Sequence, residues 1–259
     1  MSVWQAFLAG VALSAAAMTA LGLFLDSRRN RLMGRFFSHA AHEINTPITA
    51  INITVLNLLG GIFGELPPEQ AKWIEMMREQ VYRLNGMVGE LRDIIHIMVS
   101  RDFALNPESV APAELAAGAL AAIRRGVDQS NVEVKLEVPT DLPRVRVDQG
   151  RTVRTLTSLI FHARKFRSGG DLLISGQHAD GKVFLRLHYQ GLALPPGEAE
   201  RSLELFYPAR KGKSHTLNAV GLGLGVLRAV ARHQGADLTF EVQPDGQSVL
   251  SLALPVSPR

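Results

Sequence analysis

The chain has 259 residues, of which 46% are hydrophobic and 20% charged, with a formal net charge of +4 and no cysteine. The length allows one or two domains, and the lack of cysteine excludes a disulfide scaffold, a thiol nucleophile and a cysteine-ligated zinc site. So small a net charge does not by itself indicate nucleic-acid binding, and we predict no nucleic-acid partner.

An uncharged, mostly apolar stretch runs from Val3 to Leu25. About 23 residues are enough to cross a bilayer as a helix, and no basic region precedes the stretch as it would in a cleaved signal peptide. Basic residues directly after a span favour the cytoplasmic side of the membrane. We therefore predict that residues 1–30 form a single-pass anchor in the inner (plasma) membrane and that the remainder is cytoplasmic. The basic residues are Arg28, Arg29, Arg31 and Arg35.

Two amphipathic helices are predicted next, over residues 31–62 and from about residue 67 to residue 98. Each carries an apolar seam with the spacing of a coiled coil, and glycines followed by Pro67-Pro68 separate them. The seams comprise Ile44, Ile48, Ile51, Val55, Leu58 and Ile62, and then Met77, Leu84, Met87, Leu91, Ile94 and Met98. A hairpin of this kind buries its stripe by pairing with a second copy, so residues 31–101 are predicted to form a dimeric four-helix bundle.

The remainder, residues 102–259, is predicted to be a separate α+β domain after a linker over residues 100–112. Antiparallel hairpins are indicated by the turns at 179–181 and 244–246, which favours a sandwich over a doubly wound sheet. Helices are expected over residues 112–125, 151–167 and 225–234, and strands over residues 132–138, 171–175, 182–187, 237–242 and 248–254.

The segment from Ser38 to Pro47 (SHAAHEINTP) carries the chemistry of the first helix. His42 and Thr46 are four residues apart and share one helix face, and Glu43 adjoins the histidine. A neutral imidazole, with an ordinary pKa of about 6.5, is a nucleophile near pH 7, and a carboxylate beside it can fix its tautomer and accept its proton. We interpret His42 as a nucleophile; the alternative is a solvent-facing histidine on a coiled coil.

This segment resembles the phosphoacceptor box of two-component sensor histidine kinases, a histidine followed by Glu, two further residues, Thr and Pro. The resemblance implies that His42 takes phosphate from ATP and passes it to an aspartate in the receiver domain of a response regulator. It also implies that Glu43 assists phosphorylation and that Thr46 positions a water that hydrolyses the regulator's phosphoaspartate. His39 competes as nucleophile but lacks an adjacent glutamate, and we expect it to be a solvated or packing residue.

The resemblance continues to the C-terminus and implies the α/β sandwich of the histidine-kinase ATPase type, with ATP and Mg²⁺ as cofactors. The helix over residues 151–167 is similar to the one that opens the family's ATP pocket. Ser158 and His162 stand where the family has two asparagines, the second of which binds magnesium, and Lys165 is kept.

Two further boxes complete the predicted ATP pocket. In the first, Tyr189 stands where the family has the aspartate that accepts the adenine amino group, and Gly191 is kept. The last box is intact, with Gly221, Gly223 and Gly225 at alternate positions. Glycines let the backbone approach a phosphate, and the helix that starts near Gly225 directs its positive end there.

The replacements at positions 162 and 189 are predicted to weaken or abolish cofactor binding. A carboxylate that accepts from adenine contributes about 1.5–3 kcal/mol, and magnesium prefers oxygen ligands to imidazole. Together the two losses weaken ATP binding by about 10²-fold. His162 is therefore either a residual metal ligand or a packed or surface histidine.

Two classes of function remain open on these grounds. The first is a membrane-bound sensor histidine kinase-like enzyme that is phosphorylated on His42, dephosphorylates a partner response regulator, or does both. The second is a catalytically impaired pseudokinase that binds a regulator or a kinase as a scaffold. The intact box around His42 favours the first, and the altered ATP boxes favour the second.

Overall fold

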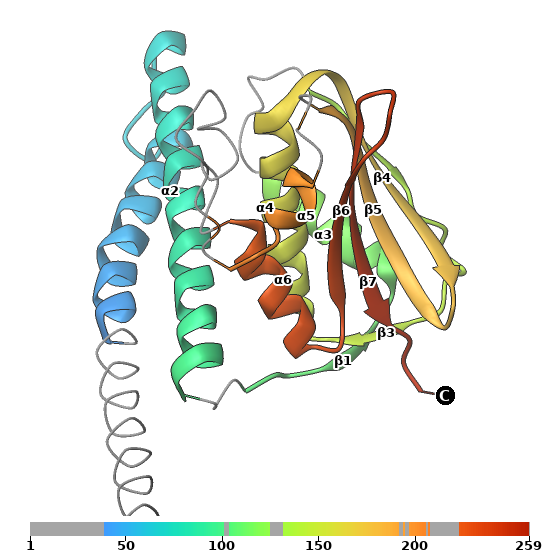
Figure 1. Cartoon of the computed structure of the whole chain (residues 1–259). Coiled ribbons are helices and arrows are strands. Elements are labelled where there is room, and N and C mark those ends of the chain that lie inside the picture. The colour runs from blue at the N-terminus through green and yellow to red at the C-terminus, as the bar shows by residue number, and fades with distance from the viewer. Residues whose placement is uncertain are drawn as a thin grey trace, which may run out of the picture.

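The computed structural model describes residues 39–100, 104–124, 132–191, 194, 197–205, 207 and 223–258. Figure 1 shows three successive layers: a helical hairpin, a layer of helices and a β-sheet. Within this described part, no helix is both long and apolar enough to cross a membrane. The predicted anchor over residues 1–30 lies outside the described residues.

The hairpin consists of a helix over residues 39–59 and the helix α2, Pro68–Ile95, which continues into a π-helical turn, His96–Ser100. The first helix ends three residues earlier than predicted because the chain turns at residues 60–63. Gly61 and Gly64 adopt the left-handed conformations that this turn requires, with φ of 73° and 101°. Pro68 occupies the first turn of α2, where its missing N–H leaves no helical hydrogen bond unmade.

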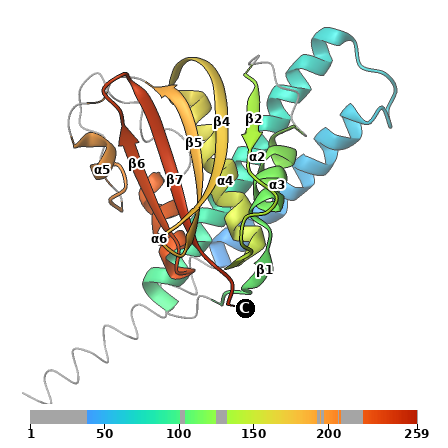
Figure 2. The same cartoon turned by 90° about the vertical axis from the view of Figure 1, so that its right-hand side faces the viewer.

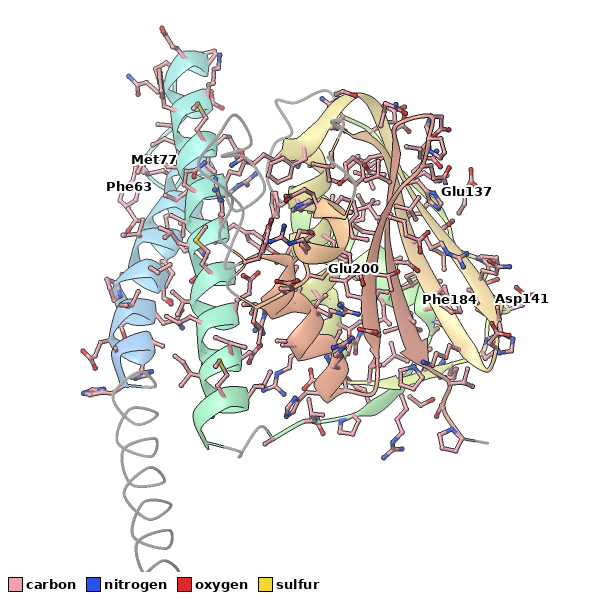
Figure 3. All side chains as sticks on the ribbon, viewed as in Figure 1. Phe63, Met77, Glu137, Asp141, Phe184 and Glu200 are labelled. Carbon is pink, nitrogen blue, oxygen red and sulfur yellow. The ribbon has the colours of Figure 1, made fainter. Side chains whose placement is uncertain are left out.

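The seam of the first helix is only partly the predicted one. Ala41, Ile48 and Val55, spaced by seven residues, are buried, whereas the predicted Ile44 and Ile51 remain 47% and 46% exposed. A single hairpin therefore buries one row of apolar residues and leaves the adjoining row open. The other large apolar residues that stay exposed on the hairpin, of which Figure 3 labels Phe63 and Met77, are Ile53, Leu56, Ile62, Phe63, Trp73, Met76, Met77, Tyr82, Leu84 and Met98.

The α/β domain has a five-stranded sheet in the order β2-β4-β5-β7-β6, in which only the β2–β4 pair is parallel. A separate antiparallel pair, β1–β3, lies at its end. The strands are β1 Glu108–Val110, β2 Val134–Glu137, β3 Val145–Val147, β4 Arg167–Ala179, β5 Lys182–Gly191, β6 Asp237–Val242 and β7 Gln247–Pro255. The helices are α3 Pro112–Arg124, α4 Gln149–Phe166, α5 Glu198–Arg201 and α6 Leu224–His233.

One face of the sheet is covered by α3, α4 and α6, and the main core lies between these helices and the strands (Figures 1 and 2). Alternate residues of β5 are buried, as expected for a strand with one covered face. The sandwich was predicted correctly. Two short strands, β1 and β3, were missed, and β1 lies inside the predicted linker.

Candidate phosphoacceptor and nucleotide sites

His42 lies on the exposed side of the first helix, directly after the buried Ala41. Glu43 and Thr46 are exposed as well. Ala41, Ile48 and Val55 form the buried row of this helix, and His42 is turned by about 100° from Ala41, out of that row. The imidazole is therefore accessible to a second macromolecule.

Within the described residues, no hydrogen bond or ion pair joins Glu43 or Thr46 to the His42 ring. Glu43 Oε1 lies 3.7 Å from Nδ1 of His39, one helical turn earlier. The Thr46 hydroxyl donates to the backbone carbonyl oxygen of His42 over 3.2 Å. The structure thus places the three predicted catalytic residues on adjoining exposed positions, and it adds the pairing of Glu43 with His39, which the sequence analysis did not predict.

Ser158 is hydrogen-bonded to the hairpin. It lies on α4, whose first turn is capped by Asp148, the acceptor of a 3.0 Å bond from the Arg151 amide. The Ser158 hydroxyl donates to Glu90 Oε1 of α2 over 2.8 Å. In the described arrangement this predicted nucleotide-binding residue therefore contacts another part of the same chain.

His162 points into the core of the α/β domain and is 2% exposed. Its ring centroid lies 4.5 Å from that of Phe166 and 6.1 Å from that of Phe240 on β6. Burial, with a smaller contribution from Lys165, lowers the pKa of His162 to about 3. Neither ring nitrogen has a hydrogen-bond partner among the described residues. Of the two alternatives for His162, the geometry matches the packed histidine.

Tyr189 is also a core residue, 3% exposed, on β5. It lies opposite Ser248 of β7, and the two side chains are hydrogen-bonded. Burial raises the pKa of the phenol well above its usual value. A methyl group at Gly191 would overlap the Ser248 hydroxyl, so this glycine is required by packing between the strands. The phenol occupies protein interior at the position of the predicted adenine contact.

The glycine box lies where the chain enters α6. Gly223, with φ of 97°, precedes the helix, and a Cβ on Gly225 would overlap the carbonyl oxygen of Glu204. Packing against the backbone thus explains Gly225 without a phosphate. Gly221 lies outside the described residues. Lys165 is exposed; burial of its stem, followed by repulsion from Arg83, lowers the pKa of its ammonium group.

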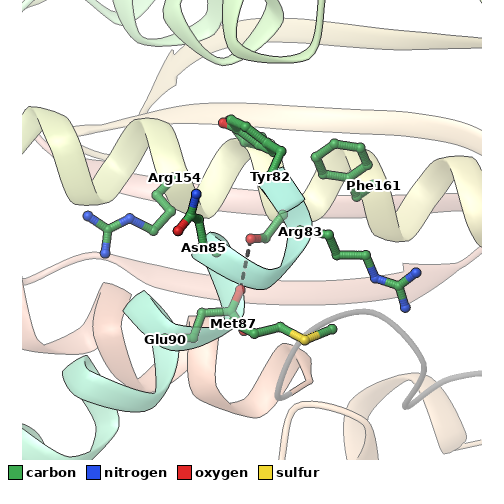
Figure 4. A pocket seen from close by; sticks show the side chains of 10 residues that line it. Tyr82, Arg83, Asn85, Met87, Glu90, Arg154 and Phe161 are labelled. Atoms are coloured by element: carbon green, nitrogen blue, oxygen red, sulfur yellow. Dashed lines mark hydrogen bonds between the residues drawn. The ribbon is translucent and has the colours of Figure 1, made fainter. Parts of the chain in front are cut away.

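A pocket of about 230 Å³ lies between α2 and α4, beside Ser158 (Figure 4). The rings of Tyr82 and Phe161, whose centroids are 6.0 Å apart, lie on one part of its wall. Arg83 and Arg154 also line it. The pocket opens between the hairpin and the α/β domain, away from the buried surroundings of His162.

Two positions of the predicted cofactor site carry side chains that differ in chemistry from those expected there. The position expected to hold magnesium carries a buried neutral imidazole among aromatic rings, and the described residues include no cluster of three or more His, Asp or Glu side chains that could hold a metal ion. The position expected to accept from adenine carries a buried phenol bonded within the sheet.

Comparison with known proteins identifies the hairpin. Residues 32–97 match the His Kinase A (phospho-acceptor) domain family. The chain is 24% identical over 224 residues to the sensor-like histidine kinase SenX3 of Mycolicibacterium smegmatis, covering 86% of this chain and 57% of the relative. The chain belongs to the two-component sensor histidine kinase family. It is also 28% identical over 219 residues to the adaptive-response sensory kinase SasA of Prochlorococcus marinus, covering 83% of this chain and 57% of that kinase.

Solved histidine-kinase structures share the fold. Full-length ShkA in complex with AMPPNP superposes with a TM-score of 0.59 at 19% identity, covering 87% of this chain and 46% of that one. Acinetobacter baumannii histidine kinase AdeS superposes with a TM-score of 0.52 at 20% identity, covering 84% and 98%. The chain spans about half the length of the curated relatives that it matches. These likenesses establish a histidine-kinase hairpin followed by an α/β domain of the histidine-kinase ATPase type.

The sequence analysis missed the acidic residues by which α2 contacts the α/β domain. Glu90 and Asp93 are 4% and 3% exposed, whereas the charged residues of an amphipathic helix usually lie on its solvent-facing side. The sequence did contain a signal for this contact, because Gly86 and Gly89 lie within a helix, where glycine is unfavourable. An isolated glycine in a helix often marks the close approach of another element.

Proposed function

We propose that this chain is a membrane-anchored, homodimeric signalling protein in which His42 exchanges phosphate with the receiver domain of a response regulator. The observation that carries the proposal is an exposed His42 on a phosphoacceptor hairpin, with Glu43 and Thr46 on adjoining exposed positions. The proposed anchor rests on the uncharged run over residues 3–25 and the arginines that follow it.

The transfer step needs only these residues and the partner's phosphoaspartate. One neutral nitrogen of His42 attacks the phosphorus, the bond from phosphorus to the aspartate oxygen breaks, and the aspartate leaves as a carboxylate. The proton on the other ring nitrogen passes to Glu43, which reaches the ring by changing rotamer, since both side chains are exposed. The same atoms perform the reverse transfer.

Thr46 supports the competing loss of phosphate to water. Its hydroxyl lies one turn after His42 and hydrogen-bonds the backbone carbonyl there, which places it beside the imidazole's point of attachment. A hydroxyl at this position can orient a water for attack on a docked phosphoaspartate, which releases inorganic phosphate and the free aspartate.

The homodimer is supported by the open apolar row of the hairpin. Ile44 and Ile51 of the first helix and Met77 and Leu84 of α2 are 46–48% exposed. Rows of this size on soluble proteins mark interaction surfaces. A second hairpin that presents the same row would complete a four-helix bundle.

A scaffold function is the second candidate, and the buried His162 and Tyr189 favour it. Relatives of this chain are histidine kinases, and the ShkA structure contains an ATP analogue, so nucleotide binding is what the family predicts. A chain that binds no ATP and carries no phosphate on His42 would act by docking alone.

The test uses the purified full chain and a panel of receiver domains phosphorylated with acetyl phosphate. We expect one receiver to lose phosphate several times faster with the wild-type chain than alone. His42→Ala should abolish transfer of radiolabel to the chain, and Thr46→Ala should slow release of inorganic phosphate while leaving that transfer intact.

Three outcomes distinguish phosphate exchange on His42 from ATP-dependent kinase activity and from a scaffold function. Labelling of His42 by ATP and magnesium would show a functional kinase pocket and contradict our account of the cofactor site. If a receiver domain binds the chain but its phosphoaspartate is lost no faster than in the receiver alone, only the scaffold function would remain. Equal rates for wild type and His42→Ala, with no label on the chain, would refute the phosphate exchange.

A further inference from the structure

The contact between α2 and α4 buries two carboxylates of the hairpin. Glu90 and Asp93 are 4% and 3% exposed on the side of α2 that meets the α/β domain. A carboxylate removed from water is strongly destabilising unless it is paired, so such positions persist only where partners are fixed. The partners are therefore informative about what α4 binds.

Three partners of these carboxylates lie on one face of α4. Asp93 Oδ1 lies 3.4 Å from Arg151 Nε, and Asp93 Oδ2 accepts from Arg154 Nη1 over 3.3 Å. Glu90 Oε1 accepts from the Ser158 hydroxyl over 2.8 Å. We call these five residues the α2–α4 interface.

Two further features match the hairpin to this face. A Cβ on Gly89 would lie 2.8 Å from Arg154 Nη1, so the lack of a side chain lets the guanidinium rest on α2. Next to it, Ile94 and Ile95 of α2 form an apolar cluster with Val226 of α6, and all three are buried. Charge pairing, close approach and apolar burial thus coincide along one helix.

The contact fixes where the α/β domain lies relative to the phosphoacceptor. In Figure 1 the helix over residues 39–59 lies on one side of α2 and the α/β domain on the other. His42 stays exposed in this arrangement. Its imidazole is therefore open to a separate protein and separated from the chain's own α/β domain by α2.

We propose that α4 binds the hairpin in place of a nucleotide, and that the α2–α4 interface holds the α/β domain away from His42 so that the histidine serves receiver domains. Ser158, which the family resemblance assigns to nucleotide, is the residue whose bond to Glu90 links the two roles. The statement about receivers rests on the proposed function; the statement about α4 does not.

The absence of cysteine from the sequence makes cross-linking a clean test in the full chain. Tyr82→Cys with Phe161→Cys places one thiol on α2 and one on α4, at two positions that line the adjoining pocket and whose rings are in contact, and leaves the five interface residues intact. A short bismaleimide should join them rapidly. The matched control is Ala71→Cys with Phe161→Cys, because position 71 shares the face of position 82 but lies about 16 Å further along the helix.

The decisive comparison adds Asp93→Asn to the first pair. The substitution removes the carboxylate that Arg151 and Arg154 share, although Arg151 keeps its contact with Asp148, and the rate of cross-linking should fall about tenfold, the factor that one charged hydrogen bond brings. Glu79→Gln, an exposed position on the same helix, should leave the rate unchanged. Hydrogen exchange of residues 86–95 in Asp93→Asn without added cysteines gives the same answer should the triple variant fold poorly.

The possible outcomes test separately the α2–α4 interface, the loss of nucleotide binding by α4, and the proposed function. Equal cross-linking with and without Asp93→Asn, and unchanged hydrogen exchange, would overturn the interface, as would a fast reaction of the Ala71 control. Binding of a fluorescent ATP analogue to the wild-type chain at cellular concentrations would overturn the claim that α4 has exchanged nucleotide for the hairpin. A stable interface in a chain that leaves every receiver unchanged would instead refute the proposed function alone.

Discussion

His162 shows how one residue can retain a helix position and lose its role. The side chain lies between Phe166 and Phe240, with neither ring nitrogen bonded to a described residue. A buried polar group without partners destabilises the fold, and a charged one does so far more. The histidine is therefore held in its neutral form, with its pKa lowered to about 3 chiefly by burial.

The first prediction follows from that pKa. Between about pH 6.5 and pH 3 the unfolded chain binds a proton at this position and the folded chain does not, so the free energy of unfolding falls as the pH drops through this window. His162 can lower the free energy of unfolding by at most about 1.4 kcal/mol for each pH unit in this window. His162→Leu should remove it, which thermal unfolding of the full chain in mild detergent at pH 7.5, about 6 and about 5 would measure.

The control for this prediction is His178→Leu, which replaces an exposed histidine on β4. It should unfold with the pH dependence of the wild type. A His162→Leu variant whose midpoint falls with pH as steeply as the wild-type midpoint would show that the ring is solvated, and would remove the argument that magnesium cannot bind there.

The sequence could indicate which residues of the predicted site share a stretch of helix, but not what surrounds them. The order of residues was enough to place His42, Glu43 and Thr46 on one exposed stretch of helix. It could not show that Glu43 would pair with His39, since either His39 or His42 lies close enough along the helix to be its partner. Nor could it show that Ser158 and His162, four residues apart, meet α2 and β6 respectively, because that depends on the tertiary packing of α4.

At the scale of elements, α2 contains a natural pair of sites for a second prediction. Gly86 and Gly89 both lie inside the helix, where replacement of glycine by alanine stabilises by about 1 kcal/mol when space allows. Space is open at Gly86, with nothing within 4 Å of a built Cβ, but Arg154 Nη1 lies 2.8 Å from one at Gly89. Gly86→Ala should therefore raise the unfolding midpoint, and Gly89→Ala should leave it unchanged or lower it.

Differential scanning calorimetry of the two variants checks this, with Gly89→Ala/Arg154→Ala as a third. Removal of the guanidinium takes away the steric conflict, so the third variant should recover the helix-propensity gain relative to Arg154→Ala alone. A rise of the midpoint in Gly89→Ala equal to that in Gly86→Ala would mean that Arg154 does not rest on α2.

The accuracy of the predicted elements follows their burial pattern. The strand over residues 237–242 was predicted with its observed bounds, because its apolar residues alternate and a turn follows it. The strands β1 and β3 have three residues each, too short to show a period, and form only because they pair with each other across 35 residues of chain. β4 extends beyond the predicted residues 171–175 at both ends, since Arg167 and Gly169 pair with β5 through an irregular register and residues 176–179 continue the regular pairing.

The whole molecule combines a layered arrangement of hairpin, helices and sheet with an open apolar surface on the hairpin. The α/β domain covers one side of α2 through polar and apolar contacts, while the row on Ile44, Ile51, Met77 and Leu84 has no cover within the described chain. A hairpin isolated in water would expose this row at a free-energy cost of about 25 cal/mol for each Å². A second hairpin could therefore bury this apolar row, whereas the α/β domain of the same chain does not.

Two isoleucines with similar exposed fractions, on different sides of the first helix, provide a test of the proposed dimer. Ile51 is 46% exposed and adjoins the buried row of Ile48 and Val55, whereas Ile53 is 52% exposed and, two residues on, points about 200° around the helix. Ile51→Lys places a charge in the proposed dimer contact and should raise the dissociation constant of the dimer at least about tenfold, since an unpaired buried charge exceeds 1.4 kcal/mol. Ile53→Lys changes the same chemistry on the opposite side of the helix and should leave it near the wild-type value. Light scattering of the full chain in detergent over a dilution series, corrected for bound detergent, measures both. Equal weakening by the two substitutions would show that the charge acts on the helix itself, and no weakening by either would show that the open row serves a different partner.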